Sequence, residues 1–269
     1  MIVKNERLRS VLINSGYTEQ QLADELGLDA KSVQRWITRG VTPRRPAAYR
    51  TARLLEVPVT WLWPDLEGDR EATSQSEIVT HYSHRANTPR QLWSDLLTNA
   101  RTDIWLLANA SLFLPEENPD SIEIIRGKAR EGVKVRIVLG DPDSPEMVLR
   151  GVEERLYDAI PARIRMALTY YSPLVGTPGI DFMLHRTSLY NSIFRYDDQM
   201  LVNQHMYGTY GYIAPILHLR RIEGADLFDT YLKSFERVWE TATPIEESNF
   251  WQQRTQAHEP TNPSPSARP

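Results

Sequence analysis

The sequence YTEQQLADELGLDAKSVQRWITRG, residues 17–40, predicts two short helices joined by a sharp turn. Thr18 is followed three residues later by Gln21, which is the spacing of a capping box at a helix N-terminus. Gly27 follows the first helix, and glycine tolerates the backbone angles that a tight turn needs. Between cap and turn, three apolar residues recur at helical spacing: Leu22, Ala23 and Leu26.

The second of these helices is expected to be buried on one side and polar on the other. Asp29 can cap it, and its buried side would consist of Val33, Trp36 and Ile37. Its outer side would present hydrogen-bond donors that can read base edges in the major groove of DNA. The other reading is a helical hairpin that merely packs in a bundle. We favour the DNA-binding reading because the cap, the turn and the exposed donors agree with one another.

This pattern resembles the helix-turn-helix of Xre/Cro-type repressors. The Leu22-Ala23 pair, Gly27, Val33 and Trp36 all fall in step with that family. The resemblance implies a DNA-binding domain that contacts double-stranded DNA through the start of the second helix. The residues expected to contact DNA are Gln20, Ala30, Lys31, Ser32, Gln34 and Arg35, with Arg39, Arg44 and Arg45 on the phosphate backbone. The alternative for the last three is a solvated basic loop.

Charge is distributed unevenly along the 269 residues, a length that suggests two domains. Residues 1–66 hold ten Lys/Arg and seven Asp/Glu, a net of +3, whereas the whole chain is at −4. A locally basic patch on an acidic protein suggests that only this patch meets phosphate. The absence of cysteine excludes disulfides, thiolate zinc sites and a cysteine nucleophile, and it favours a cytoplasmic protein. No apolar run approaches the ~20 residues of a membrane span, and the start does not resemble a signal peptide.

The first domain is predicted to comprise residues 1–66 as an all-α, five-helix, lambda-repressor-like unit. Pro43 and Pro46 are expected to forbid helix before about Ala47. The stretch after the second helix resembles an actinobacterial variant of the Xre type. A polar segment, residues 67–77, is predicted to be the interdomain linker. Besides the two helices above, the predicted helices are residues 6–15, 47–55 and 60–63.

The second domain, residues 78–247, is predicted to be α/β. Residues 103–108, 120–131 and 133–140 read as strand, helix and strand, which favours a parallel pair. Residues 145–168 read as largely helical with a break at Pro161. Residues 248–269 are proline-rich and predicted to be disordered. The remaining predicted elements are strands at 180–184, 192–196 and 200–203, a hairpin turn at Asp197-Asp198 and a closing helix at 227–241.

This order, with GVKVRIVLGD (residues 132–141) and the closing helix DLFDTYLKSFERVWE (residues 226–240), resembles the phospholipase D-like fold. Active members of that superfamily carry a His-x-Lys pair, an aspartate and a Gly-Ser pair on the late hairpin. With Asp197 on the motif aspartate, Tyr190 and Ser192 replace the His and Lys, and Gln204-His205 replaces Gly-Ser. The resemblance therefore implies a catalytically degenerate domain with no catalytic residues and no enzyme activity.

The late hairpin is nevertheless polar, and a degenerate cleft can still bind a small molecule. Side chains alternate along a strand, and the odd-numbered polar residues are expected to share one face with Asp197. The candidate ligand-binding residues are Asn191, Arg195, Asp197, Asn203, His205 and Tyr207. The alternative is a dimer contact or a solvated face. The six histidines have no metal-ligand spacing and there is no phosphate-binding loop, so no metal and no cofactor are predicted.

Three functions remain from the sequence. The first is a transcription regulator that binds DNA as a homodimer and whose second domain senses a small-molecule effector, dimerises or both. The second is a phospholipase D-like phosphodiesterase or nuclease tethered to DNA, whose activity would depend on His205. The third is a ligand-free DNA-bound scaffold. The lost His-Lys pair counts against the second, and nothing in the sequence separates the first from the third.

Overall fold

The structure, a computed structural model, describes residues 5–69 and 77–257. The described residues form two units. One contains the residues up to Glu77 together with Arg221–Asp229, and the other contains Ile78–Arg220 together with the residues from Thr230 onward.

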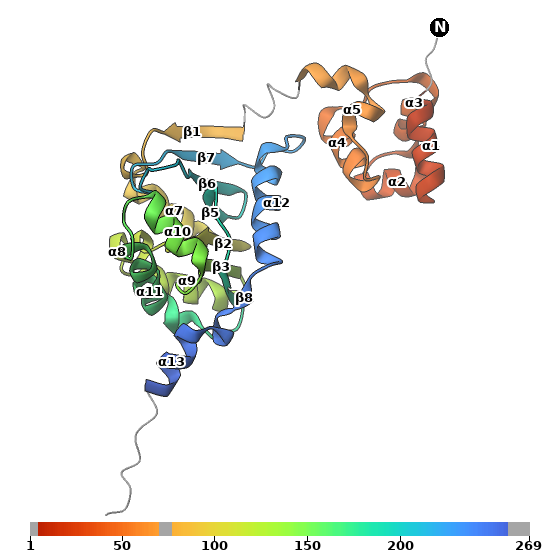
Figure 1. Cartoon of the computed structure of the whole chain (residues 1–269). Coiled ribbons are helices and arrows are strands. Elements are labelled where there is room, and N and C mark those ends of the chain that lie inside the picture. The colour runs from red at the N-terminus through yellow and green to blue at the C-terminus, as the bar shows by residue number, and fades with distance from the viewer. Residues whose placement is uncertain (1–4, 70–76, 258–269) are drawn as a thin grey trace, which may run out of the picture. The chain divides into compact units, whose positions relative to one another are not determined.

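The first unit is a small bundle of helices (Figure 1). Thr18 and Gln21 form the predicted capping box, and Gly27 has a left-handed φ of 67° after the first helix of the pair. Asp29 caps the second helix by accepting the N–H of Lys31. The elements are α1 (Glu6–Ser15), α2 (Glu19–Leu26), α3 (Ala30–Arg39), α4 (Arg45–Leu54), α5 (Val59–Leu62) and a 3-10 helix (Pro64–Asp69).

The core of this unit fixes α3 against its neighbours. Val33 and Ile37 are fully buried, and Trp36 packs edge-on against Trp63 with ring centroids 6.1 Å apart. The predicted apolar face of α2 is buried in the same cluster. The outer side of α3 is therefore the side left to solvent.

Two predictions for this part of the chain are wrong. Helix α4 begins at Arg45, before Ala47, because a proline in the first turn of a helix loses no hydrogen bond. The predicted linker, residues 67–77, is structured at both ends. The 3-10 helix runs to Asp69, and the buried Glu77 carboxylate accepts the N–H groups of Leu227 and Phe228 at 2.8 and 3.1 Å. Residues 70–76 lie outside the described residues.

The second unit is built on an eight-stranded sheet in the order β1-β7-β6-β5-β2-β3-β4-β8. The predicted parallel strand–helix–strand unit is confirmed, because β2 pairs with β3 in parallel and β3 with β4 likewise. All other neighbouring pairs are antiparallel. The strands are β1 (Ile78–Tyr82), β2 (Asp103–Ala108), β3 (Lys134–Gly140), β4 (Ile180–His185), β5 (Asn191–Tyr196), β6 (Gln199–Gln204), β7 (Ile216–Arg220) and β8 (Thr243–Pro244).

Helices cover both faces of this sheet (Figure 1). One face packs against α12, where Trp105 of β2 lies 5.0 Å from Phe235. The opposite face packs against α7, where Trp93 lies 5.1 Å from Phe194 of β5. The helices are α7 (Arg90–Asn99), α8 (Phe113–Glu117), α9 (Ser121–Arg130), α10 (Pro145–Glu153), α11 (Ala159–Tyr171), α12 (Leu227–Trp239) and α13 (Asn249–Ala257).

The structure corrects two further predictions and adds three strands. The helical stretch after β3 breaks at residues 154–158, and Pro161 instead lies in the first turn of α11, where it is tolerated. The predicted disordered tail, residues 248–269, begins with helix α13, while residues 258–269 lie outside the described part. Strands β1, β7 and β8 were not predicted. Within the described residues, no helix has the length and apolar character to cross a bilayer.

Candidate functional site

The predicted recognition helix presents a polar side to solvent. Lys31, Gln34 and Arg35 are exposed on α3, and Ala30 and Ser32 are half-buried. Because Val33, Trp36 and Ile37 face the core on the other side, the exposed donors are held on a rigid element. Gln20 is exposed on α2, and its amide donates to Asp24 at 2.8 Å. This arrangement can offer donors to base edges.

The arginines that follow α3 differ in their surroundings. Arg39 and Arg44 are exposed, and Arg45 is half-buried. Arg50 belongs to the same basic stretch, but its guanidinium donates to the carbonyls of Leu26 and Glu25 at 3.3 and 3.1 Å, at the end of α2. Arg50 therefore stabilises the C-terminus of that helix, where orphan carbonyls need donors.

On the late hairpin, the expectation that odd-numbered residues share one face is wrong. The β5–β6 register pairs Ser192 with Asn203 and Arg195 with Met200. Because the turn at Asp197-Asp198 has two residues, each odd-numbered residue of β5 pairs with an even-numbered residue of β6, and the reverse. Even-numbered residues of β5 therefore lie on the same face as odd-numbered residues of β6.

This register divides the predicted ligand residues. Asn203 and His205 line a pocket together with Ser192, which was not among the candidates. Arg195 lies on the opposite face, toward α12. Tyr207 is 85% exposed, and neither it nor Asn191 lines the pocket.

Arg195 holds the sheet together on the α12 side. It is 7% exposed, and its Nη2 lies 3.1 Å from Asp103 Oδ2 while its Nε donates to the carbonyl of Asp197 at 2.9 Å. The guanidinium also lies 4.3 Å from the centre of the Trp105 ring. These contacts make Arg195 a structural residue.

Asp197 is also structural. Its carboxylate accepts the N–H groups of Arg101, Thr102 and Asp103 at 2.8, 2.8 and 2.9 Å. Burial alone would raise the pKa of Asp197, but these backbone hydrogen bonds outweigh it and hold the pKa below its usual value. Asp197 therefore ties the β5–β6 turn to the start of β2.

Asp197→Asn is expected to lower the free energy of unfolding by about 1–2 kcal/mol at neutral pH, because charged acceptors make the stronger hydrogen bonds. The folded-state pKa is depressed, so the stabilisation is present above the unfolded-state pKa of about 3.9 and is lost as pH falls through the folded value. Urea unfolding of both proteins from pH 8 to pH 3 measures this. A stability difference that does not shrink below about pH 4 would contradict the assignment.

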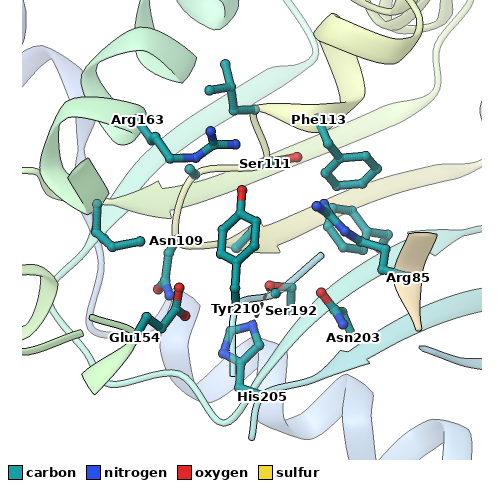
Figure 2. Close-up of a pocket in the computed structure, with 16 residues that line it drawn as sticks. Arg85, Asn109, Ser111, Phe113, Glu154, Arg163, Ser192, Asn203, His205 and Tyr210 are labelled. Carbon is teal, nitrogen blue, oxygen red and sulfur yellow. Dashed lines mark hydrogen bonds between the residues drawn. The ribbon is translucent and has the colours of Figure 1, made fainter. Parts of the chain in front are cut away.

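The pocket lies on the sheet face that packs against α7, between the ends of β2, β5 and β6 and helix α11, and it has a volume of about 80 Å³. Figure 2 shows Arg163 and Arg85 on opposite sides of the Tyr210 ring, with His205 and Ser192 below it. The pocket contains both charged and neutral polar groups.

The floor of the pocket is a hydrogen-bonded Ser192–His205 pair. Ser192 Oγ lies 3.0 Å from His205 Nε2, and His205 Nδ1 lies 3.1 Å from the carbonyl of Leu189. A carbonyl can only accept, so Nδ1 carries the proton and Nε2 accepts from the Ser192 hydroxyl. Burial, with the nearby positive charges of Arg150 and Arg85, lowers the pKa of His205 to about 4. The imidazole is therefore neutral at pH 7, with both nitrogens engaged.

The walls of the pocket carry two guanidinium groups. That of Arg85 lies 4.1 Å from the centre of the Phe113 ring, and that of Arg163 lies 5.7 Å from the centre of the Tyr210 ring. Burial lowers the pKa of Arg85, although arginine remains charged in proteins. Glu154 also lines the pocket and pairs with Arg150 at 2.6 Å.

Sequence reasoning missed these charged residues. Arg85 lies in a 3-10 turn (Arg85–Asn87), Arg163 on α11 and Glu154 just after α10, so they are far apart in the sequence and share no motif. Only the tertiary fold brings them together. In the described part of the chain, no group of three His, Asp or Glu side chains is arranged so that it could hold a metal ion.

Comparison with known proteins yields low similarity throughout. No protein-family model matches the chain, and no curated protein matches it. The structure of TrmBL2, described as an archaeal chromatin protein with a novel mode of DNA binding, is 11% identical, covers 76% of this chain and 72% of its own, and gives a TM-score of 0.38. Nuc, a phospholipase D family member from Salmonella typhimurium, is 14% identical and covers 58% of this chain and 90% of its own, with a TM-score of 0.37.

A third similar structure is phosphatidylserine synthase from Haemophilus influenzae. It is 10% identical, covers 85% of this chain and 58% of its own, and gives a TM-score of 0.38. All three TM-scores are below 0.5, so these similarities do not establish a family for the chain.

Proposed function

We propose that the protein is a sequence-specific, DNA-binding transcription regulator whose α/β unit binds a small ligand, dimerises or both. The observation that carries this proposal is helix α3. Its inner side is buried against a capped helix-turn-helix core, and its outer side exposes Lys31, Gln34 and Arg35. Rigid presentation of Arg, Lys and Gln donors is what major-groove reading requires.

A homodimer forms part of the proposal, because a helix-turn-helix usually binds two half-sites as a dimer. Support comes from the outer side of α10, where Val148, Leu149 and Val152 are 51%, 51% and 54% exposed. Contiguous exposed apolar side chains often mark an interaction surface. We assign this surface, at positions 148, 149 and 152, to contact with a second copy of the chain.

Val152→Glu is therefore expected to convert the dimer to a monomer, because two copies of the surface would bring buried negative charges together. Light scattering after size-exclusion chromatography measures the mass. Ile13→Glu is the matched control, since Ile13 is 73% exposed on α1 in the other unit and this variant should remain a dimer. A wild-type monomer at micromolar concentration, or a dimeric Val152→Glu protein, would refute the assigned surface.

The pocket geometry weighs against a tethered phosphodiesterase or nuclease. Both ring nitrogens of His205 are held by hydrogen bonds within the protein, to Ser192 and to the carbonyl of Leu189, which favours a packing role for this ring. Ser192 replaces the lysine that the phospholipase D-like motif requires. We therefore propose no enzyme activity and no cofactor for this chain.

Genome-wide capture of DNA bound to the full-length protein tests the regulator, followed by binding to the recovered site at two salt concentrations. A short palindrome bound far more tightly than unrelated DNA supports the proposal. If the protein binds DNA without sequence preference and this binding is lost when salt is added, the proposal is contradicted, because phosphate contacts alone give that behaviour.

A further inference from the structure

The strongest unexplained feature of the α/β unit is an excess of positive charge in its pocket. Within residues 5–69 and 77–257, neither Arg85 nor Arg163 forms an ion pair with a carboxylate. The Nε of Arg85 is fully buried and has no hydrogen-bond partner among the described residues. Arg85 and Arg163 are half-buried, so their unpaired charges are partly removed from water, and the buried Nε of Arg85 is an unsatisfied donor that calls for an explanation.

The carboxylates near the pocket act on these arginines without forming an ion pair with them. Burial raises the pKa of Glu154, and the positive charge of Arg163 acts in the opposite direction. Glu154 is engaged by Arg150 at 2.6 Å, and this pair is nearly buried. The negative charge of Glu117 acts to raise the pKa of Arg85, but the ion pair that Glu117 forms is with Arg90, at 3.7 Å. Two guanidinium groups therefore face the pocket without a carboxylate in direct contact with them among the described residues.

The neutral groups of the pocket are mostly occupied by one another. The Ser192 hydroxyl donates to His205, and the Asn203 amide donates to the carbonyls of Ala214 and Pro215 at 3.4 and 3.0 Å. Asn109 differs, because its Oδ1 is buried in the pocket wall without a partner among the described residues. The pocket thus offers cationic donors together with one unfilled acceptor.

We infer that this pocket binds the oxyanion group of a small hydroxylated metabolite, with Arg85 and Arg163 as its counterions and Asn109 Oδ1 accepting from the hydroxyl. Guanidinium groups bind carboxylate and phosphate oxygens through parallel N–H donors. The volume of about 80 Å³ limits the pocket to a compact ligand. This ligand would be the effector of the proposed regulator. Only its effect on DNA binding rests on that proposed function.

Calorimetric titration of the full-length protein tests the inference with three probes: glycerate, inorganic phosphate and glycerol. Glycerate and glycerol differ only at the carboxylate, so glycerol is the neutral control. We expect saturable binding of glycerate, phosphate or both, and none of glycerol. Binding of glycerate alone identifies a carboxylate ligand, and binding of phosphate alone identifies a phosphorylated one.

Arg85→Gln and Arg163→Gln should each weaken that binding at least tenfold. The matched control is Arg165→Gln on the same helix, whose exposed side chain pairs with Asp143 outside the pocket and which should bind as the wild type does. Thermal unfolding establishes that each variant is folded at the titration temperature. If the Arg85→Gln protein does not fold, anion binding by the Arg163→Gln protein, whose changed side chain is half-buried, tests the inference by itself.

Three outcomes would overturn the inference: binding of neither anion, equal binding of glycerol, or wild-type binding by folded Arg85→Gln and Arg163→Gln proteins. Binding to the captured DNA site is measured without any probe. Loss of specific DNA binding with intact anion binding would refute the regulator but not the pocket. Intact DNA binding without anion binding would refute only the pocket.

Discussion

Arg35→Ala is expected to weaken binding to the captured DNA site by about 1–3 kcal/mol, which is roughly 5- to 150-fold in affinity. Arg35 is exposed on α3, one residue before the buried Trp36 that anchors the helix. Removal of its side chain therefore deletes a donor without disturbing the core. An arginine in the major groove commonly makes two hydrogen bonds to guanine, and their loss leaves the base edge unpaired.

The measurement is a titration of wild-type and Arg35→Ala proteins with the captured site and with a site changed at one base pair at a time. The variant should lose discrimination at one position of the site. Arg44→Ala is the informative comparison, because loss of a phosphate contact weakens binding to all sequences and reduces the salt slope by about 1. Unchanged affinity of Arg35→Ala for the captured site would remove Arg35 from the interface.

The helices of the first unit could be predicted from sequence because their signals are local. The capping box at Thr18 and the left-handed glycine after α2 each depend on a few neighbouring residues. The error at α4 has a local cause as well. A proline disrupts a helix in its interior but is common in its first turn. The N–H groups of the first turn have no partner within the helix, so the N–H that Pro46 lacks costs α4 no hydrogen bond.

Most strands of the sheet could be predicted from their local apolar pattern, but β7 was missed although it is buried on both faces. Strand β2 is a near-continuous apolar run, which is typical of parallel strands covered by helices, and β3 alternates at its start and is rich in β-branched residues. Strand β1 is an exposed edge strand, and β7 contains His218, whose ring bonds Gln199 at 2.9 Å. The pairing of β1 with β7 joins residues more than a hundred positions apart, and a local pattern carries no such information.

The pocket could be predicted in part. The polar hairpin pointed to Asn203 and His205, which do line it. The register across the turn was assigned wrongly, because the face that a strand residue occupies depends on its partner as well as on its own number. Nothing in the sequence around Arg85 or Arg163 indicates a binding site, because single arginines are common on protein surfaces.

Arg195→Met is expected to lower the free energy of unfolding of the α/β unit by about 3 kcal/mol, because it leaves the carboxylate of Asp103 without its partner. The Asp103–Arg195 contact is 3.1 Å long, with side chains 20% and 8% exposed. The change also removes the guanidinium from the Trp105 ring. Urea unfolding followed by tryptophan fluorescence measures the loss.

The double variant Asp103→Asn/Arg195→Met separates the ion pair from simple loss of packing. Removal of both charges should recover part of the stability, because a neutral side chain at position 103 no longer needs a counterion. Anion binding by folded Arg195→Met protein should equal that of the wild type, since Arg195 lies on the sheet face opposite the pocket. A variant of wild-type stability that had lost anion binding would return Arg195 to the ligand site, and the assignment of faces on the β5–β6 hairpin would then have to be reversed.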